Sequence, residues 1–499
     1  MMSWSNEVPS GVRALISELK TPATRTTFDV LNPATDALVA KVADMDAGDA
    51  TKAIERAEQA LELWSRRTTS RQRSRALRAW HDAVVEKEDE LATLMTLESG
   101  KPKTESLGEL RYGASFLEWF AEEGPRVVGS VDTNGSVERV AATTKRAVGV
   151  AAMITPWNFP LAMITRKCGA AVAVGCPCVL KPAEDTPLTA LALAELAREI
   201  LPDGVLNVVT CSRENAAAVG DVFCASPVVR ALSFTGSTAV GKQLYAKCAG
   251  TVKRVSLELG GNAPFVVLDD ADLDVAVTCA MASKFRNAGQ TCVSADRFVV
   301  QDAVYDAFRD KLAAKIQSSA KMGNGLDDGV TVGPLISRRA ADRVRGLLEE
   351  ESSSSRGENN QVKPLLDVPT AGSKNFVAPT LVEYADADAA DASPCWATET
   401  FGPVIPLFRA PRDWDDAQLA AFANRGPTGL ASYVISKDLR RAWNLADRLD
   451  TGMCGINQGV ISAASAPFGG VKESGLGREG GIHSGLHEYL EEKYVCFGI

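Results

Sequence analysis

Residues 148–154, with the sequence Val148-Gly-Val-Ala-Ala-Met-Ile154, begin a repeating pattern from which a fold can be predicted. Further apolar runs of strand length lie at residues 178–181, 205–209 and 231–234, and helix-like segments such as residues 188–201 separate them. This alternation predicts a parallel sheet covered by helices. Ligands of such sheets bind beyond the carboxyl ends of the strands, where Trp157, Lys181 and Gly236 are expected to lie. The region is therefore interpreted as a nucleotide-binding domain.

One turn in this region is a candidate phosphate site. The turn Gly236-Ser237-Thr-Ala-Val-Gly241 follows the last of these strands and opens a helix. Backbone N–H groups at a helix N-terminus can bind a pyrophosphate. The turn lacks the G-x-G-x-x-G spacing of the common dinucleotide fingerprint, and a single glycine-rich turn is more often only a turn. Both interpretations stay open on the pattern alone.

The chain around this region is long enough for more than one core. With 499 residues, it is expected to form at least two domains. Upstream, we expect a polar lead-in at residues 1–27, amphipathic helices at 50–64 and 71–97, and a hairpin at 129–147. Downstream, a second α/β region extends to about residue 457, with strands at 297–300 and 404–408, helices at 304–322 and 338–351, and a solvated loop or hairpin at 350–374.

Composition excludes several classes of function. The chain has 54 Lys and Arg against 63 Asp and Glu, a net charge of −9, so nucleic acid is not expected as a partner. No apolar run reaches the ~18 residues of a membrane helix. Cys176-Pro-Cys178 has no histidine near it in the sequence, and no metal site is predicted. Eleven cysteines without scaffold spacing favour a reducing compartment, which predicts a cytoplasmic protein, with the mitochondrion as the alternative.

Two residues are candidates for covalent chemistry. Cys292 lies in a polar, glycine-containing turn after a helix-like segment, the kind of open loop that a nucleophilic thiolate needs. Glu258 is a lone carboxylate between apolar residues and a Gly-Gly turn, a setting that raises the pKa of a carboxyl group into the range of a general base. Most cysteines are buried small hydrophobes, so this pattern alone leaves that simpler interpretation of Cys292 open.

Seven sequence blocks, in order along the chain, resemble the motifs of the aldehyde dehydrogenase superfamily. They are Thr155-Pro-Trp-Asn158-Phe-Pro160, Lys181-Pro-Ala-Glu184, Phe234-Thr-Gly236-Ser-Thr-Ala-Val-Gly241, Leu257-Glu-Leu-Gly-Gly-Asn262, Phe285-Arg-Asn-Ala-Gly-Gln-Thr-Cys292, Glu399-Thr-Phe401-Gly-Pro403 and Pro467-Phe-Gly-Gly-Val-Lys-Glu-Ser-Gly-Leu-Gly-Arg478. The likeness runs from about residue 28 to the C-terminus. Within the superfamily, three segments are similar to succinate-semialdehyde dehydrogenases: Phe116-Leu-Glu-Trp-Phe-Ala-Glu-Glu-Gly124, Met163-Ile-Thr-Arg166-Lys and Glu488-Tyr-Leu-Glu-Glu-Lys-Tyr-Val-Cys496.

This resemblance implies an aldehyde dehydrogenase-like α/β fold with three parts. They are a Rossmann-type parallel-sheet cofactor domain at residues 1–128 and 148–258, an α/β catalytic domain at 259–457, and a small oligomerisation arm and tail at 129–147 and 481–499. The tail is expected to pair with a neighbouring subunit. A homodimer or homotetramer is therefore predicted.

The resemblance also implies a role for each site residue. Cys292 attacks the aldehyde, Asn158 and the Cys292 backbone N–H stabilise the oxyanion, and Glu258 activates the hydrolytic water. The cofactor residues are Trp157, Lys181, Glu184, Gly236, Ser237, Gly241, Glu399 and Phe401. By sequence alone, Asn158 could be a turn residue and Glu399 a solvated acid. The expected cofactor is NAD, with NADP as the alternative, because a Glu184 carboxylate at the ribose would repel a 2′-phosphate.

Three further residues point to the substrate. By resemblance, Arg166, Arg286 and Ser462 hold the carboxylate of succinate semialdehyde, and guanidinium groups suit that task. Alternatives are glutarate semialdehyde, an uncharged aliphatic or amino aldehyde, or arginines that bridge carboxylates structurally. A relic without catalytic activity is disfavoured, because the candidate nucleophile and base are both present.

Overall fold

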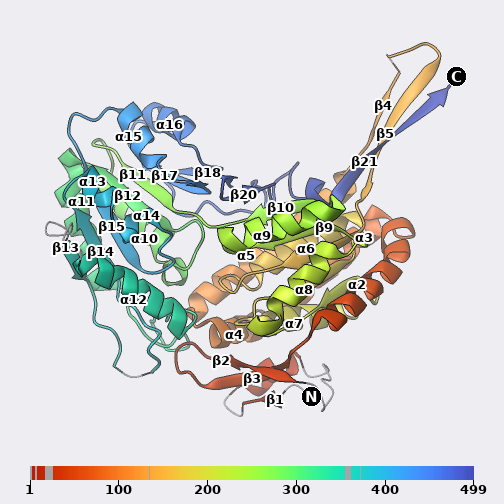
Figure 1. Ribbon diagram of the computed structural model, residues 1–499, viewed down its shortest axis with the longest axis horizontal. Coiled ribbons are helices and arrows are strands. Elements are labelled where there is room, and N and C mark those ends of the chain that lie inside the picture. The colour runs from red at the N-terminus through yellow and green to blue at the C-terminus, as the bar shows by residue number, and fades with distance from the viewer. Residues whose placement is uncertain (1–2, 6–7, 17–25, 134, 354–360, 371) are drawn as a thin grey trace.

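The computed structural model describes residues 1–499 apart from 1–2, 6–7, 17–25, 134, 354–360 and 371. Two large sheets, each covered by helices, lie next to each other (Figure 1). A narrow sheet projects from the end of the molecule that carries the C-terminus. The predicted α/β class is therefore confirmed.

The first large sheet corresponds to the repeating pattern. Its strands are β6 (Val150–Ile154), β7 (Cys178–Lys181), β8 (Leu206–Val208), β9 (Val229–Thr235), β10 (Arg254–Glu258) and β20 (Gly475–Leu476). They lie in the order β20-β10-β9-β6-β7-β8, and each neighbouring pair is parallel except β10 with β20. One face packs on α3 (Ser70–Glu86), α5 (Lys103–Glu123), α6 (Ala162–Val174) and α7 (Pro187–Ala197), and the other on α2 (Ala47–Leu61), α8 (Arg213–Ala225) and α9 (Thr238–Cys248).

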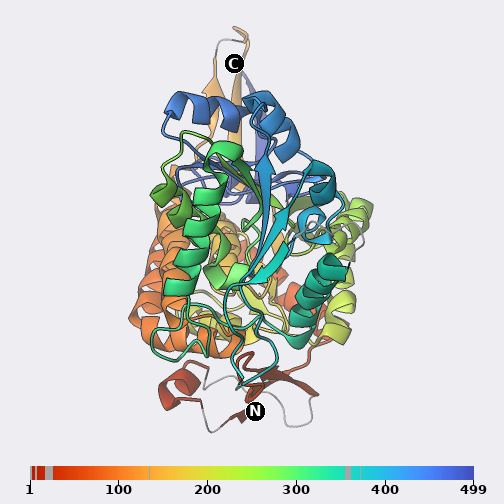
Figure 2. The same ribbon diagram turned by 90° about the vertical axis from the view of Figure 1, so that its left-hand side faces the viewer.

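The second large sheet contains β12, the strand that follows the loop with Cys292. Its strands are β11 (Ala263–Val267), β12 (Ala295–Gln301), β13 (Gln361–Pro364), β14 (Thr380–Tyr384), β15 (Val404–Ala410), β17 (Ala431–Ile435) and β18 (Met453–Ile456). The order is β13-β14-β15-β12-β11-β17-β18, with only β13 and β14 antiparallel among these neighbours. Helices α10 (Leu273–Lys284) and α11 (Asp302–Ser319) cover one face, and α12 (Arg338–Ser353), α15 (Asp416–Ala423) and α16 (Leu439–Arg448) cover the other (Figure 2).

The projecting sheet contains the predicted hairpin. Strands β4 (Ser130–Asp132) and β5 (Arg139–Ala147) form it, and β21 (Leu490–Gly498) completes the order β21-β5-β4. The C-terminal tail thus pairs with β5 of its own chain, from Leu490 opposite Ala147 to Gly498 opposite Arg139. Any contact of this sheet with a neighbouring subunit therefore uses its faces or its outer edges.

Two expectations from the sequence were wrong in detail. The polar lead-in contains β1 (Ser3–Trp4) and α1 (Ser10–Ala14), and Val12 of α1 is buried. The single helix expected at residues 71–97 is two helices, α3 and α4 (Glu88–Ser99), because Lys87 leaves the helical conformation with φ −100° and ψ 27°. Acidic residues fill the first turn of α4, where the helix dipole favours them.

Shorter elements complete the described chain. They are β2 (Thr27–Leu31), β3 (Leu38–Ala43), η1 (Glu62–Arg66), η2 (Gly124–Arg126), η3 (Ala249–Thr251), η4 (Arg286–Gly289), α13 (Ala387–Asp391), α14 (Pro394–Ala397), β16 (Thr428–Gly429), β19 (Val471–Lys472) and η5 (His487–Tyr489). Because β20 lies beyond residue 457 but joins the first sheet, the chain returns to the first sheet after it has formed the second. The domain boundaries given above stay a prediction.

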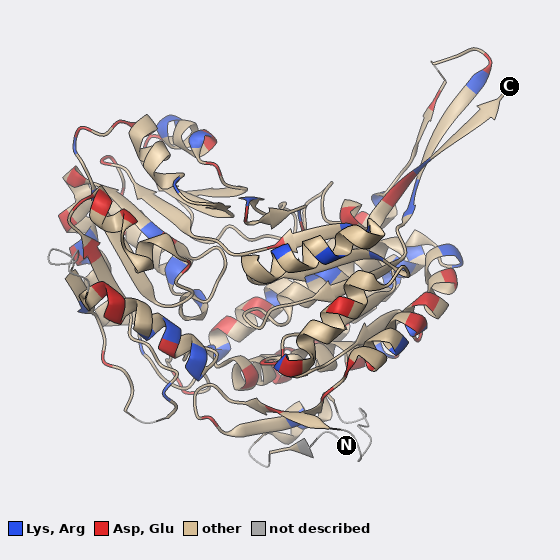
Figure 3. Cartoon of the chain, in the orientation of Figure 1, with Lys and Arg blue, Asp and Glu red and all other residues tan. Residues whose placement is uncertain are grey.

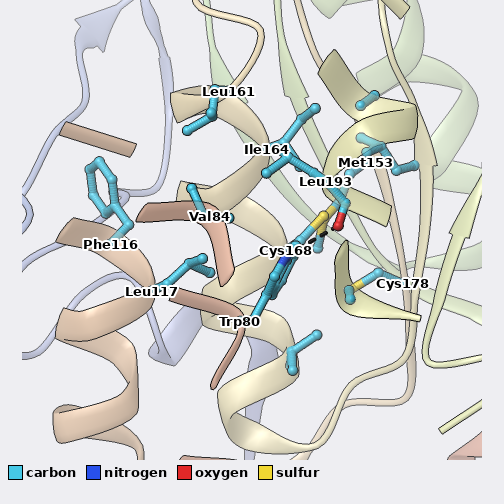
Figure 4. Packing of buried hydrophobic residues seen from close by; sticks show 14 of the residues in the cluster. Trp80, Val84, Phe116, Leu117, Met153, Leu161, Ile164, Cys168, Cys178 and Leu193 are labelled. Atoms are coloured by element: carbon cyan, nitrogen blue, oxygen red, sulfur yellow. Dashed lines mark hydrogen bonds between the residues drawn. The ribbon is translucent and has the colours of Figure 1, made fainter. Parts of the chain in front are cut away.

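The core of the first domain forms where four helices, α3, α5, α6 and α7, meet the sheet. Trp80 is fully buried, and its indole N–H donates to the carbonyl of Leu193 at 3.1 Å (Figure 4). Phe116, Leu117 and Ile164 are buried in the same cluster. This packing fixes α5 and α6 against the sheet, and both helices carry residues of the site described below.

Charged residues of both signs lie mainly along the outer helices (Figure 3). Glu98 on α4 is an exception, because it is fully buried. Its carboxylate accepts the backbone N–H of Leu188 at 2.8 Å and that of Thr189 at 3.0 Å, and also the Thr189 hydroxyl. Glu98 therefore caps the N-terminus of α7 from another helix, and burial raises its pKa to about 7.

We predict that Glu98→Ala lowers the free energy of unfolding by about 2 kcal/mol or more, because two N–H groups and a hydroxyl lose their acceptor. Urea denaturation followed by tryptophan fluorescence measures this. Since the pKa rises from 4.5 to about 7 on folding, the stabilisation by Glu98 falls as pH rises between those values. The loss should therefore be larger at about pH 5 than at about pH 8. Exposed Glu199→Ala is the control, and an equal loss in both variants would contradict the role of the cap.

Candidate active site

Cys292 follows a turn with unusual backbone geometry. After α10 and η4, three consecutive residues have positive φ: Asn287 at 51°, Ala288 at 54° and Gly289 at 79°. A side chain at Gly289 would meet the carbonyl oxygen of Gly402 at 2.3 Å, so only glycine fits there. Such strain persists only where surrounding contacts enforce it, and it is common at functional sites.

Buried hydrogen bonds enforce this turn. Gln290 is fully buried, accepts the N–H of Ile336 at 2.9 Å and donates to the carbonyl of Asn287 at 3.0 Å. The N–H of Asn287 donates to the carboxylate of Glu105 at 2.6 Å. The catalytic loop is thereby tied to α5 of the cofactor domain and to the segment before α12.

The thiol of Cys292 is half-buried and protonated at rest. Burial raises its pKa to about 12, although Arg166 and Arg286 lower it and Glu399 and Glu258 raise it further. Its backbone N–H forms no hydrogen bond with any residue that the structure describes. Cys292 therefore needs a base before it can act as a nucleophile, and its N–H remains free to donate to a ligand.

Glu258 is the base candidate in the same cavity. It ends β10, is 2% exposed, and neither carboxylate oxygen has a hydrogen-bond partner among the described residues. Burial and the nearby carboxylate of Glu479 raise its pKa well above 4.5. Glu258 and Cys292 both line a cavity of about 390 Å³. Sequence reasoning placed these two residues together, and the structure brings them to one site.

Asn158 lines this cavity as well, and a buried ion pair holds its backbone. Its carbonyl accepts from the Lys101 ammonium at 2.6 Å and from the Asn287 amide at 3.1 Å. Lys101 forms an ion pair with Glu109, and both are almost fully buried. The Asn158 side-chain amide donates one hydrogen to the carbonyl of Gln290 at 3.0 Å, which leaves its second hydrogen for another acceptor.

The other side of the cavity fits a dinucleotide cofactor. It is lined by the residues Trp157, Gly236, Ser237, Gly260, Glu399 and Phe401. Ser237 caps the N-terminus of α9, where free N–H groups favour a phosphate. An added Cβ at Gly236 would lie 2.5 Å from the Phe234 ring, and one at Gly241 would lie 2.3 Å from Leu259. These two glycines let the turn lie close to the strand ends, and they leave the cofactor side of the cavity open.

Glu399 and Phe401 are held on the cofactor side of the cavity. Glu399 accepts the N–H of Gly261 at 3.0 Å, and burial raises the pKa of its carboxyl group to about 8. Phe401 has φ 47° and packs edge-on against Trp157, with ring centroids 5.5 Å apart. The intervening Thr400 donates to Asp296 at 2.8 Å in a fully buried network with Lys284. This network fixes the positions of Glu399 and Phe401, the two candidate cofactor-binding residues on either side of Thr400.

Lys181 and Glu184 lie outside the 390 Å³ cavity. The Lys181 ammonium, at the end of β7, lies 3.9 Å from the Glu184 carboxylate and donates to the carbonyl of Pro182 at 3.1 Å. Glu184 lines a separate cavity of about 320 Å³ together with Ser212 and Arg213. Both residues stay candidates for the distal part of a cofactor, which extends along the strand ends.

The arginine candidates differ in their surroundings. Arg166 on α6 is 1% exposed, its Nε lies 2.5 Å from the carboxylate of Glu479, and its Nη1 has no partner among the described residues. Lys167 forms an ion pair with the same Glu479. Arg286 stacks on the Phe159 ring at 4.9 Å, and no ion pair joins it to any described residue. Ser462 is half-buried, and no described hydrogen bond links it to these residues.

Four supporting residues were missed by sequence reasoning. Lys167 and Glu479 flank the candidate base, and Lys101 and Glu109 hold Asn158. Neither Lys101 nor Glu479 was assigned a role from the sequence. One available signal was the pair Arg166-Lys167 inside a fully buried apolar helix, because buried cations need carboxylate partners.

Comparison with known proteins agrees with this geometry. The family model described as "Aldehyde dehydrogenase family" matches residues 20–495. Escherichia coli succinate-semialdehyde dehydrogenase (NADP+) GabD is 49% identical, and Pseudomonas aeruginosa glutarate-semialdehyde dehydrogenase is 48% identical; each alignment covers 95% of this chain and 94% of the relative. The crystal structure of succinate-semialdehyde dehydrogenase from Burkholderia pseudomallei superposes with a TM-score of 0.90, at 45% identity and 97% coverage of both chains. The chain belongs to the aldehyde dehydrogenase family.

Proposed function

We propose that this chain oxidises succinate semialdehyde to succinate through a covalent intermediate on Cys292, with a nicotinamide dinucleotide as the hydride acceptor. The observation that carries the proposal is the charge of the buried cluster beside Cys292. Arg166 and Lys167 face the carboxylate of Glu479 and, when it is ionised, that of Glu258. Arg286 forms no ion pair with a described residue, so one positive charge beside Cys292 is uncompensated, and a substrate with one carboxylate balances it.

The first half of the reaction uses Cys292 and Asn158. The thiol proton of Cys292 passes to water, and the thiolate sulfur attacks the aldehyde carbon to form a thiohemiacetal. The oxyanion that develops is held by the second hydrogen of the Asn158 amide and the backbone N–H of Cys292. A nicotinamide dinucleotide held by Glu399 and Phe401 would supply the acceptor for the hydride that leaves this carbon. The product on the protein is a thioester of Cys292.

The second half of the reaction uses Glu258. Its carboxylate removes a proton from a water molecule, and the resulting hydroxide attacks the thioester carbon. The carbon–sulfur bond breaks, the acid leaves, and the Cys292 thiolate takes the proton from Glu258, which becomes a carboxylate again. Since Glu258 acts only when it is ionised, its raised pKa makes this half sensitive to pH.

Glutarate semialdehyde is the second candidate substrate. The 48% identity to the Pseudomonas aeruginosa enzyme of that name supports it, and this aldehyde also carries one carboxylate. The charge of the cluster favours both substrates over uncharged aldehydes. Chain length is set by the depth of the pocket, so a panel of aldehydes decides between them.

We propose that the enzyme is a homodimer or homotetramer that uses its arm. Val131 is 70% exposed, Val137 93% and Phe497 52%, an unusual apolar surface for a free sheet.

None of the described helices is long and apolar enough to cross a membrane. A cytoplasmic location, with the mitochondrion as the alternative, stays a prediction.

We predict that Glu258→Gln forms the thioester but hydrolyses it slowly. Stopped-flow absorbance should show a burst of reduced cofactor equal to the enzyme concentration, followed by turnover reduced at least about 100-fold. In the wild type, kcat should rise with pH as Glu258 ionises, and this dependence should disappear in the variant. Cys292→Ala is the matched control and should show neither burst nor turnover. A burst in that control would show that Cys292 is not the nucleophile.

We predict that Arg286→Met lowers kcat/KM for succinate semialdehyde about 30-fold, or about 2 kcal/mol, because the substrate carboxylate loses a charged partner. Butanal, which has the same number of carbons and no carboxylate, should be affected far less. Exposed Arg440→Met controls for the loss of a positive charge. Equal losses for the two aldehydes would mean that Arg286 has a structural role.

We predict that Glu184→Ala shifts cofactor preference towards NADP. A carboxylate at the ribose repels a 2′-phosphate, so its removal should raise the ratio of kcat/KM with NADP to that with NAD about tenfold. The name of the Escherichia coli relative specifies NADP(+), so the wild-type ratio should be measured alongside. An unchanged ratio would show that Glu184 does not contact the ribose.

A further inference from the structure

Tyr112 on α5 has a buried hydroxyl group that no residue uses. Its oxygen is inaccessible to solvent and has no hydrogen-bond partner among the described residues. The ring packs edge-on against Phe116, with centroids 5.0 Å apart, and joins the small apolar cluster of Phe159, Ala162 and Met163. Phenylalanine would fill the same space, so packing does not explain the hydroxyl.

Arg166 presents a second unused donor in the same region. Its Nη1 has no partner among the described residues, whereas its Nη2 contacts the sulfur of Met163 at 3.0 Å. Its guanidinium carbon lies 5.9 Å from the centre of the Phe116 ring. Phe116 therefore lies beside both residues, and Met163 contacts Arg166 and belongs to the cluster on which Tyr112 packs. Tyr112 is also close enough to act electrostatically on Arg166. The Tyr112 hydroxyl on α5 and Nη1 of Arg166 on α6 are thus two donors without a hydrogen-bond partner among the described residues. They lie on the two sides of the small region that contains Phe116 and Met163.

This region adjoins the site of the reaction. Phe159 and Met163 line the cavity that also contains Cys292, and Phe159 is the ring on which Arg286 stacks. A ligand whose aldehyde carbon lies at Cys292 would extend past these two side chains towards Tyr112 and Arg166. A carboxylate has two oxygens and accepts several hydrogen bonds, so it can satisfy a guanidinium and a hydroxyl together.

We propose that Tyr112 is a specificity-determining residue whose hydroxyl donates a hydrogen bond to the distal carboxylate of the substrate, beside Arg166. The proposal rests on the proposed oxidation of a semialdehyde and adds a residue from α5 to its site. The phenol supplies a donor without a charge, so it recognises the carboxylate without adding to the positive charge of the cluster. Uncharged aldehydes have no group to accept this bond.

Tyr112→Phe tests the proposal, because it removes one oxygen and keeps the ring. With succinate semialdehyde, kcat/KM should fall about 10- to 100-fold, mainly through KM, as expected for a hydrogen bond to a charged group. With butanal it should change less than about twofold. Succinate, used as an inhibitor of butanal oxidation, should bind more weakly by the same factor as the loss in kcat/KM for succinate semialdehyde. Tyr245→Phe, on the exposed side of α9, is the control and should match the wild type.

The possible failures are distinguishable. If the wild type does not prefer succinate semialdehyde to butanal, the proposed function fails, and the role of Tyr112 fails with it. If the wild type and Arg286→Met behave as predicted but Tyr112→Phe keeps full discrimination, only the role of Tyr112 is overturned. Equal losses for both aldehydes, or a lower urea midpoint that accounts for the loss, would mean that the hydroxyl serves structure through a bound water.

Discussion

Glu479 offers one carboxylate to two buried cations, and the rest of the site depends on that shared ion pair. Burial alone would raise the pKa of Glu479, but Arg166 and Lys167 lower it, so it stays ionised. Removal of one partner from a buried ion pair typically costs about 3–5 kcal/mol, because the remaining charge is left unpaired. The cluster lies between α6 and the segment that precedes the tail, and it therefore joins the N-terminal and C-terminal parts of the chain.

The same cluster sets the chemistry of Glu258. With Glu479 ionised nearby and no hydrogen bond of its own, Glu258 resists ionisation, and its pKa is raised in the direction that suits a general base. On the other side of the cavity, the Lys101 and Glu109 pair holds the backbone of Asn158, and Asn287 links it to the catalytic loop. One buried ion pair thus adjusts the pKa of the base, and a separate one holds the backbone of the oxyanion donor.

Local patterns predicted the parts of this protein that depend on local sequence. The strands of the first sheet, the hairpin and the cluster of Cys292, Glu258 and Asn158 followed from apolar runs, turn residues and motifs. The break at Lys87 was missed because the hydrophobic period continues through it, and it is visible only in the backbone angles. Glu479 and Lys101 were missed for a different reason: their partners are 312 and 57 residues away in sequence, and no local pattern records such contacts.

The central claim is that one uncompensated positive charge beside Cys292 selects an aldehyde with one carboxylate. The most direct test compares kcat/KM of the wild-type enzyme for succinate semialdehyde and for butanal, at low and at high salt. Because the cluster is buried, the preference for succinate semialdehyde should be at least about 100-fold and should persist at high salt. A ratio near one, or a preference that disappears at high salt, would contradict the claim.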